Sequence, residues 1–361
     1  MSRQESHSYR WNGTEWAIAT NSSITQTNEP IRIATLNILA DCFPFFVEMT
    51  IRSTERYEWL CKGIIDLNPT ILGLNEVTTN ALERLKQCSF IRENYFITEL
   101  LNENKKLLFP HACVLLSKLP FIEVFAISVS GRKREAIVGK IQLGQTKETC
   151  AYICSHHATP YQAEKNADLR SQQIRDIMSI LEPLNQPFII MGDLNLYHDF
   201  EDAVVLDNRL TDAWAQTHFS DQYPFNDKDL GYTFDALKNT LIPYYVPGSC
   251  DQMRLDRILF SYGFPALAIV PCVLWANEAI KSDNYLFPSD HFGLSIDIVL
   301  EKTSEMAMMP LNKSDPTAEQ VLRHNVENND DERLNRVGIF RKTKAWTAHA
   351  FWLGGRALGL K

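Results

Sequence analysis

The chain has 361 residues, of which 45% are hydrophobic, and its 44 acidic and 36 basic side chains give a formal charge of −8. This composition allows one large globular domain or two small ones. It excludes a polybasic binder over the whole chain, so any contact with nucleic acid has to be local. The sequence has no long apolar run and no basic-then-apolar start, which argues against a membrane span or a signal peptide. We therefore expect an intracellular protein, cytoplasmic or nuclear, with no membrane partner.

The chain starts with a polar segment. Residues 1–30 are rich in Ser, Thr and Asn and are expected to form a leader. Within it, Tyr9, Trp11 and Trp16 could hold a short hairpin against a core.

Residues 31–300 alternate between short β-branched runs and helical periodicity, which is typical of strands interleaved with helices. Apolar residues on one face predict helices over 52–67 and 166–182. The predicted strands are too many for one simple parallel sheet, so we expect two packed sheets with helices outside. These strands cover 31–36, 70–75, 112–116, 122–129, 135–142, 149–155, 187–191, 255–260, 266–274 and 293–300.

The composition changes after the last predicted strand. Residues 301–331 are rich in Met, Asn, Ser, Pro and Asp, which is typical of a linker. Residues 332–361 form a basic tail, with seven Lys or Arg, no Asp or Glu and four aromatic residues from Arg333 onward. Such a tail could contact single-stranded nucleic acid, but an amphipathic helix or an irregular end fits it equally well.

Polar side chains that a buried strand terminus does not need stand at the termini of four predicted strands: Asn37, Glu76, and the Asp193 and Asn195 pair follow three of them, and Asp290 with His291 comes just before the last. One such residue alone would be interpreted as a turn former. Four together favour a shared site.

The chemistry of these side chains suits phosphodiester hydrolysis. Mg²⁺ prefers oxygen ligands and binds through one or two carboxylates, for which Glu76 is the leading candidate. Asp193 could take the proton of the attacking water, and the Asn195 amide could donate to a phosphate oxygen. His291 could donate to the phosphoryl group if a neighbouring carboxylate keeps it protonated.

Six segments in this order resemble the motifs of the endonuclease/exonuclease/phosphatase superfamily, over about 270 residues. The resemblance implies a four-layer α/β sandwich, in which two packed mixed β-sheets are flanked by helices, and a Mg²⁺-dependent phosphoesterase in which Mn²⁺ can substitute. The segments are Thr35 to Asn37, Leu74 to Val77, Ser155-His156, Gly192 to Asn195, Arg254 to Ile258 and Ser289 to Leu294.

Within the superfamily the chain is similar to the tyrosyl-DNA phosphodiesterase 2 branch, which also has a segment like Thr233 to Ala236. This likeness implies hydrolysis of a 5′-phosphotyrosyl bond between protein and DNA or RNA, so the expected partner is nucleic acid with a 5′-linked adduct. It also implies the site residues. Asn37 and His156 would contact the phosphate, Glu76 the metal and Phe234 the nucleic acid, whereas Asp193, Asn195, His291, Asp256 and Asp290 would be catalytic.

Some assignments stay open at this point. Either Asp256 or Asp290 could orient His291. His156 is favoured over the adjacent His157 because it follows Ser155. Tyr197, which we also expect to bind the substrate, stands where the branch has a basic side chain that reaches the DNA phosphate. The candidates for a local basic groove are Arg52, Arg56, Arg132 to Arg134, Arg254 and Arg257, although a solvated charge run is the default interpretation of Arg132 to Arg134.

Other functions are compatible with the same motifs. The alternatives within the superfamily are a poly(A) 3′-exonuclease, an abasic-site endonuclease and an inositol or sphingolipid phosphoesterase. A scaffold that has lost catalysis is a third kind, but every acid, amide and imidazole needed is present. The sequence gives neither the leaving group nor the oligomeric state.

Overall fold

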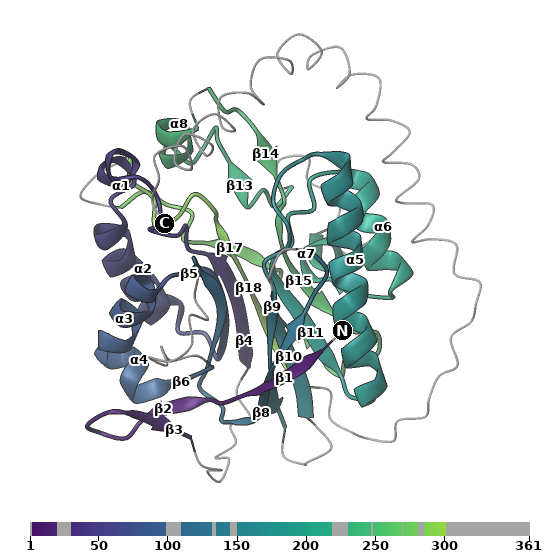
Figure 1. The fold of residues 1–361 in the computed structure, drawn as a ribbon. Coiled ribbons are helices and arrows are strands. Elements are labelled where there is room, and N and C mark those ends of the chain that lie inside the picture. The colour runs from purple at the N-terminus through teal and green to yellow at the C-terminus, as the bar shows by residue number, and fades with distance from the viewer. Residues whose placement is uncertain are drawn as a thin grey trace. The chain divides into compact units, whose positions relative to one another are not determined.

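The computed structural model describes residues 2–19, 30–98, 110–131, 135–144, 150–218, 230–246, 248–268, 270–280 and 285–300. The predicted linker and tail lie outside this part, as does the Arg132 to Arg134 run. The described residues form two β-sheets that face each other, with helices outside (Figure 1). The predicted α/β fold with two packed mixed sheets is confirmed. No described helix has both the length and the apolar character needed to cross a membrane.

The first sheet has seven strands, and only β10 and β11 run parallel in it. In spatial order they are β1 (Arg3–Ser6), β8 (Phe121–Ser128), β9 (Glu135–Gln142), β10 (Cys150–Ser155), β11 (Phe188–Asp193), β15 (Asp256–Phe260) and β12 (Thr211–Asp212).

The second sheet has nine strands, and its parallel pair is β4 and β5. In spatial order they are β16 (Ala266–Ala268), β18 (Gly293–Leu300), β4 (Ile31–Asn37), β5 (Ile71–Val77), β7 (Ala112–Ser117), β6 (Phe96–Ile97), β2 (Tyr9–Trp11) and β3 (Trp16–Ile18), with β17 (Val273–Trp275) also paired to β18. A separate short pair is formed by β13 (Phe234–Asp235) and β14 (Gln252–Met253).

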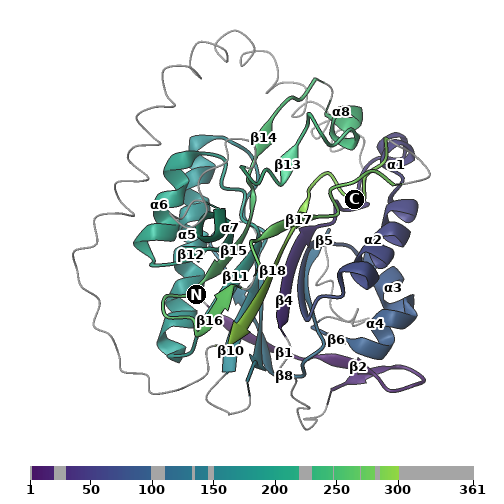
Figure 2. The same cartoon turned by 180° about the vertical axis from the view of Figure 1, so that it is seen from behind.

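Helices cover the outer faces of both sheets (Figure 2). On the nine-stranded sheet lie α2 (Ser53–Leu67), α3 (Thr79–Gln87) and α4 (Ser89–Asn94), and on the seven-stranded sheet lie α5 (Glu164–Leu181) and α6 (Asp202–Asp207). The remaining helices are α1 (Phe45–Ile51), α7 (Ala213–His218) and α8 (Leu241–Tyr245), together with two 3₁₀ turns at Glu182–Leu184 and Asp199–Glu201.

The alternation of side chains along the strands creates three packed layers of core. On β11, Ile189 and Met191 enter the core between the sheets, whereas Ile190 packs under α5. On β4, Ile33 faces the other sheet and Ala34 faces the helices. Because successive residues of a strand point to opposite faces, a strand buried on both sides is apolar throughout. This explains the continuous apolar runs of the sequence.

One predicted strand is wrong. The run 266–274 was expected to be continuous, but the structure has two short strands there, β16 and β17. Pro271 lies between them, and it lacks the N–H group that a strand needs to pair with its neighbour. Both pieces pair with β18 at different places along it.

Candidate active site

The side chains of Asn37 and Asp193 join the two sheets at one end of the sandwich. Asn37 ends β4 and Asp193 ends β11. The Asn37 Nδ2 atom donates a hydrogen bond of 3.0 Å to Asp193 Oδ2, and the backbone N–H of Asn195 donates to Asp193 Oδ1 at 3.0 Å. Asp193 is only 2% exposed. Two of the predicted polar strand ends therefore meet in one buried cluster.

Asn75 fixes the backbone of the Asp193 strand. Its Oδ1 atom accepts a 2.8 Å hydrogen bond from the backbone N–H of Asp193, and its Nδ2 atom donates to Ser155 Oγ at 3.3 Å. Gly192 has a φ of +133°. A Cβ atom there would lie 2.2 Å from the carbonyl oxygen of His156 and 2.7 Å from Asn75 Oδ1, so only glycine allows this close approach.

His291 reaches the same carboxylate from the loop before β18. Its Nε2 atom lies 3.9 Å from Asp193 Oδ2, and its Nδ1 atom lies 2.8 Å from Asp256 Oδ2. Asp290 instead accepts a hydrogen bond from Ser289 Oγ at 3.2 Å. In this geometry Asp256, rather than Asp290, orients the imidazole, which answers a question that the sequence left open.

Burial and neighbouring charges set the protonation of these groups. Burial raises the pKa of the Asp193 carboxyl from its ordinary 3.8 to about 7, with Asp256 adding to the shift and His291 opposing it. Burial alone would lower the pKa of His291. The surrounding carboxylates, with Asp256 first, outweigh it and hold that pKa well above the ordinary 6.5. A base with a pKa near neutral thus faces a protonated imidazole.

Glu76 lies beside this cluster in an unusual backbone conformation. Its φ is +60°, and the pairing of β5 with β7 changes register between Leu74 and Val77. Such a bulge redirects a side chain away from the regular pleat. The Oε2 atom accepts a 2.9 Å hydrogen bond from the backbone N–H of Ala40, and the side chain stays 20% exposed. This partly exposed carboxylate fits a divalent cation, since the ion can keep some of its water ligands.

The structure corrects the choice between the two histidines after β10. His157 has its Nε2 atom 3.5 Å from Asp193 Oδ2 and 3.9 Å from Glu76 Oε1. His156 is fully buried, and its backbone carbonyl oxygen faces Gly192. The physical reason is the alternation of side chains, which sends two successive residues to opposite sides. His157 therefore lies in the candidate site.

Tyr197, which was predicted to bind the substrate, contacts Asn195 and Arg170 within the protein. Its hydroxyl donates a 2.6 Å hydrogen bond to Asn195 Oδ1, and Asn195 Nδ2 donates to the carbonyl oxygen of Ala158 at 3.2 Å. The guanidinium of Arg170 lies 4.9 Å from the centre of the Tyr197 ring. Tyr197 thus fixes the orientation of the Asn195 amide through its Oδ1 atom.

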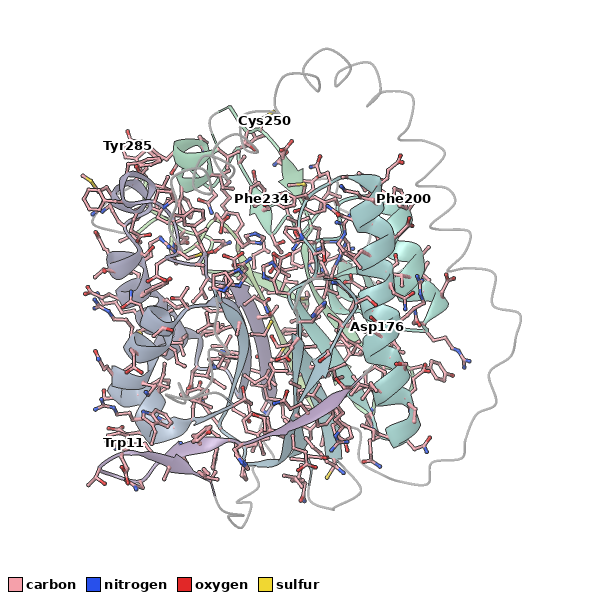
Figure 3. The ribbon with its side chains drawn as sticks, viewed as in Figure 1. Trp11, Asp176, Phe200, Phe234, Cys250 and Tyr285 are labelled. Carbon is pink, nitrogen blue, oxygen red and sulfur yellow. The ribbon has the colours of Figure 1, made fainter. Side chains whose placement is uncertain are left out.

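Phe234 lies on β13, and Figure 3 shows it at the end of the molecule that carries β13 and β14. Its ring packs edge-on against the His291 imidazole, with centroids 5.4 Å apart. The preceding Thr233 accepts hydrogen bonds at its Oγ1 atom from the backbone N–H groups of Leu255 and Asp256. This segment therefore connects the Asp256 strand with the His291 loop, and Phe234 covers one side of the imidazole.

The arginines expected to form a basic groove are used within the protein. Arg56 is fully buried and donates to the carbonyl oxygens of Ile38 and Leu39. Arg254 and Arg257 both lie near Asp212, with nitrogen–oxygen distances of 2.7 and 3.5 Å. These three candidates for a groove are therefore engaged within the fold. Arg52, which lies between α1 and α2, pairs with Glu55 of α2.

Sequence reasoning missed two further residues that face the site, Asn75 as a bridge and His111 as a neighbour of Glu76. His111 directly precedes β7, and its ring lies 5.6 Å from that of His157. A signal was present for Asn75, which is a polar residue inside an otherwise apolar strand. His111 stands at the start of an apolar run, and nothing in the sequence around it indicated a place in the site.

The fold and the site together define a hydrolase of phosphate esters. Residues 34–291 match the Endonuclease/Exonuclease/phosphatase family, and the chain belongs to this family. Enzymes of this family hydrolyse phosphate esters and depend on a divalent metal ion, for which the described residues offer a group of candidate ligands.

Tyrosyl-DNA phosphodiesterase 2 (TDP2) is among the similar proteins. The Xenopus laevis protein is 23% identical over 258 residues, which cover 68% of this chain and 62% of that protein. The solved TDP2 structures from Caenorhabditis elegans and from D. rerio, the latter with a single-strand DNA product, share the fold. Their TM-scores are 0.57 and 0.58 at 20% and 18% identity, with 75% and 74% of this chain and 74% and 98% of theirs covered.

Proposed function

We propose that this enzyme hydrolyses the 5′-phosphotyrosyl bond of a protein–DNA or protein–RNA adduct. The proposal depends mainly on one observation: buried Asp193, with a pKa near 7, lies between the Asn37 amide and the His291 imidazole. This pairs a base for the attacking water with a proton donor for the phosphoryl oxygens.

Glu76 would hold the metal ion beside this pair. Mg²⁺ is the expected ion because it is abundant and binds carboxylates, and Mn²⁺ can replace it. When bound, the ion neutralises charge on the phosphoryl group. Asp193 takes the proton of the water, Asn195 is held for a phosphate contact, and protonated His291 donates to a developing negative oxygen.

The nature of the leaving group supports a tyrosyl substrate. A phenolate has a pKa of about 10 and departs without a proton, whereas a sugar alkoxide needs an acid. The catalytic set described above contains one base, Asp193, and one acid, the protonated His291, which faces Asp193 and is assigned to the phosphoryl oxygens. It therefore leaves no second acid for a sugar alkoxide. The likeness to TDP2 supports the same substrate. An enzyme that acts on such adducts is expected in the nucleus or cytoplasm.

The test is turnover on a panel of substrates that share a phosphodiester and differ in leaving group. It comprises 5′-tyrosyl DNA, 5′-tyrosyl RNA, poly(A), an abasic duplex and a lipid headgroup ester, each with the wild type and with Asp193→Asn. We expect release of tyrosine to be fastest and Asp193→Asn to lower kcat by about 100-fold or more. Preference for poly(A) or the abasic duplex would contradict the tyrosyl assignment.

A further inference from the structure

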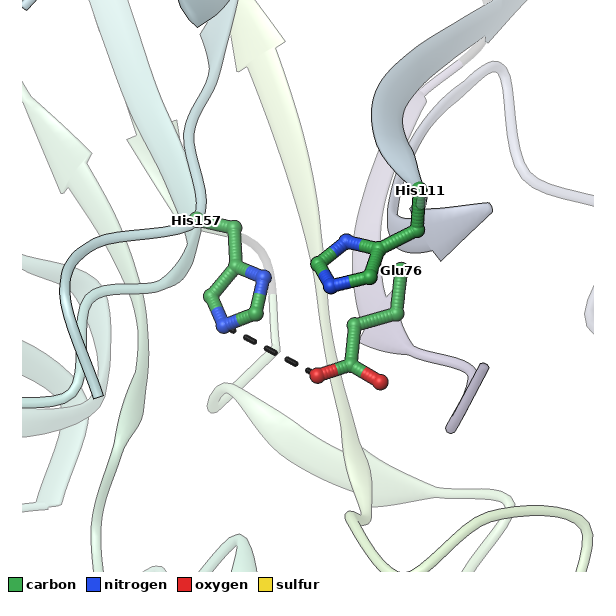
Figure 4. A group of neighbouring side chains, drawn as sticks. All are labelled: Glu76, His111 and His157. Carbon is green, nitrogen blue, oxygen red and sulfur yellow. Dashed lines mark ion pairs between the residues drawn. The ribbon is translucent and has the colours of Figure 1, made fainter. Parts of the chain in front are cut away.

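His111, His157 and Glu76 form a cluster of potential metal ligands (Figure 4). His157 connects it to Asp193, whose Oδ2 atom lies 3.5 Å from His157 Nε2. The imidazole rings of the two histidines face each other at 5.6 Å with an angle of 27° between their planes. One ligand atom from each of the three residues lies within 4.8 Å of the others. The Glu76 carboxylate closes one side of the group, with Oε1 3.9 Å from His157 Nε2.

Three separate elements supply these side chains. Glu76 comes from the bulge in β5, and His111 directly precedes β7, the neighbouring strand. His157 follows β10 of the opposite sheet and is 6% exposed. The hydrogen bond from Ala40 holds Glu76 Oε2, so that Oε1 is the oxygen facing His157. The backbone thus positions all three groups before any ion binds.

The dimensions and charge of the cluster suit a cation. A transition metal lies about 2.1 Å from each imidazole nitrogen or carboxylate oxygen, so two ligand atoms can be at most about 4.2 Å apart. The 3.9 Å separation of Glu76 and His157 already meets this limit. The third ligand, His111, has its ligand atom within 4.8 Å of the other two, so a small change of its side-chain torsion angles brings it within the limit. Asp193 Oδ2, at 3.5 Å from His157, adds negative charge and disfavours a bound anion.

The donor types decide which cation fits best. Mg²⁺ prefers six oxygen ligands, whereas neutral imidazole suits first-row transition metals, most of all the later ones such as Zn²⁺, and Mn²⁺ is the weakest binder of that series. We propose that Glu76, His111 and His157 together bind a first-row transition-metal ion, and that they bind it more tightly than Mg²⁺. The proposal shares Glu76 with the proposed function but needs no assumption about the substrate. At high cellular Mg²⁺ the same carboxylate still serves Mg²⁺, so the two ions compete.

The experiment measures metal binding by the full chain after chelator treatment. Calorimetry should give affinities in the order Zn²⁺, Co²⁺, Mn²⁺ and then Mg²⁺, with Mn²⁺ at least about tenfold tighter than Mg²⁺. Pulsed EPR of the Mn²⁺ complex should show ¹⁴N couplings from bound imidazole. This readout needs no substrate and no variant. Equal affinities for Mn²⁺ and Mg²⁺, or a Mn²⁺ spectrum without nitrogen couplings, would overturn the proposal.

Variants then identify the ligands. His111→Ala and His157→Ala should each weaken Mn²⁺ binding by about tenfold or more, and the double variant should lose the nitrogen couplings. His198→Ala is the matched control, because that histidine stacks on Phe200, bonds the carbonyl oxygen of Gln162 and is not a member of the cluster. Unchanged Mn²⁺ binding in His111→Ala would refute the three-ligand site. Nitrogen ligation with no tyrosyl release would refute the proposed substrate and leave this site in place.

Discussion

His291 Nδ1 lies 2.8 Å from Asp256 Oδ2, and both side chains are buried, at 6% and 0% exposure. One ring nitrogen is thereby fixed, and the other points toward Asp193 at 3.9 Å. Because Asp256 belongs to β15, which pairs with β11, the position of the imidazole depends on the same sheet that carries Asp193. The orientation of the proton donor relative to the base is therefore built into the strand pairing.

This contact predicts how activity depends on pH. The carboxylates raise the pKa of His291, and the protonated ring is the donor, so kcat/KM should fall as pH rises through that elevated pKa. Asp256→Asn removes the nearest negative charge and should move this fall to lower pH. Asp290→Asn is the control and should shift it less, since the nearby Asp290 raises the pKa of His291 less than Asp256 does and the ring nitrogen Nδ1 bonds Asp256. Equal shifts in the two pH profiles would contradict the assignment of Asp256.

The same pKa has a consequence for stability. A histidine whose pKa is raised in the folded state stabilises the fold fully below its unfolded pKa of about 6.5, and this contribution is lost as pH rises through the folded value. Asp256→Asn should therefore reduce the free energy of unfolding more at pH 6 than at alkaline pH. Denaturant unfolding at several pH values measures this difference.

Tyr197 predicts a positioning effect on Asn195. Tyr197→Phe removes the hydroxyl that donates to Asn195 Oδ1, a hydrogen bond worth about 1 kcal/mol. We expect kcat to fall about fivefold with little change in KM, because the amide is less well held. Tyr161→Phe is the matched control, since only its backbone N–H contacts Tyr197. If Tyr197→Phe changes KM alone, the residue contacts the substrate, as the sequence suggested.

A fully buried ion pair supports this loop. Arg170 and Glu201 lie 2.7 Å apart with both side chains at 0% exposure, and Glu201 also accepts from the backbone N–H groups of Tyr197 and His198. Glu201→Gln leaves a buried charge without its partner and should cost about 3–5 kcal/mol of stability. Glu58→Gln removes a mostly exposed carboxylate 3.9 Å from Arg84 and should cost less than about 1 kcal/mol. Chemical denaturation compares the two, and similar losses would contradict the argument.

The strand-end residues of the site were predictable from the sequence because buried strands rarely end in several acids, amides and imidazoles. Asn37, Glu76 and Asp193 lie at such ends, His291 lies just before β18, and the structure brings them together. The predicted apolar face of 166–182 is also confirmed, since Ile174, Ile177 and Leu181 pack under the seven-stranded sheet. Local pattern was sufficient in both cases because one face of each element has to be buried.

The remaining features depend on contacts between distant segments. Alternation says that His156 and His157 face opposite sides but not which side holds the site, and β10 ends before both. The arginines illustrate the same limit. Their charge predicts a cationic surface, yet Arg257 finds Asp202 and Asp212 in other elements and is 4% exposed. Such pairing is set by tertiary structure and leaves no regular spacing in the sequence.

Because those arginines are engaged within the fold, we can predict how the affinity for nucleic acid depends on salt. Each phosphate contact adds about −0.7 to −0.9 to the slope of log affinity against log salt. Arg56, Arg254 and Arg257 are engaged within the fold, so the domain should contribute a shallow slope. The seven basic residues from Arg333 to Lys361 should supply most of any steeper dependence.

The measurement compares the full chain with a version that ends at Leu300, both carrying Asp193→Asn to prevent turnover. Affinity for a single-stranded oligonucleotide is determined between low and moderate salt. We expect the shortened protein to bind more weakly at low salt with a flatter slope, because fewer counterions are released. In the active forms, kcat on a small aryl phosphodiester should be unchanged, since the catalytic side chains all lie before residue 300. Equal slopes in the two proteins would show that the domain itself makes the phosphate contacts, through cations other than the three arginines held by the fold.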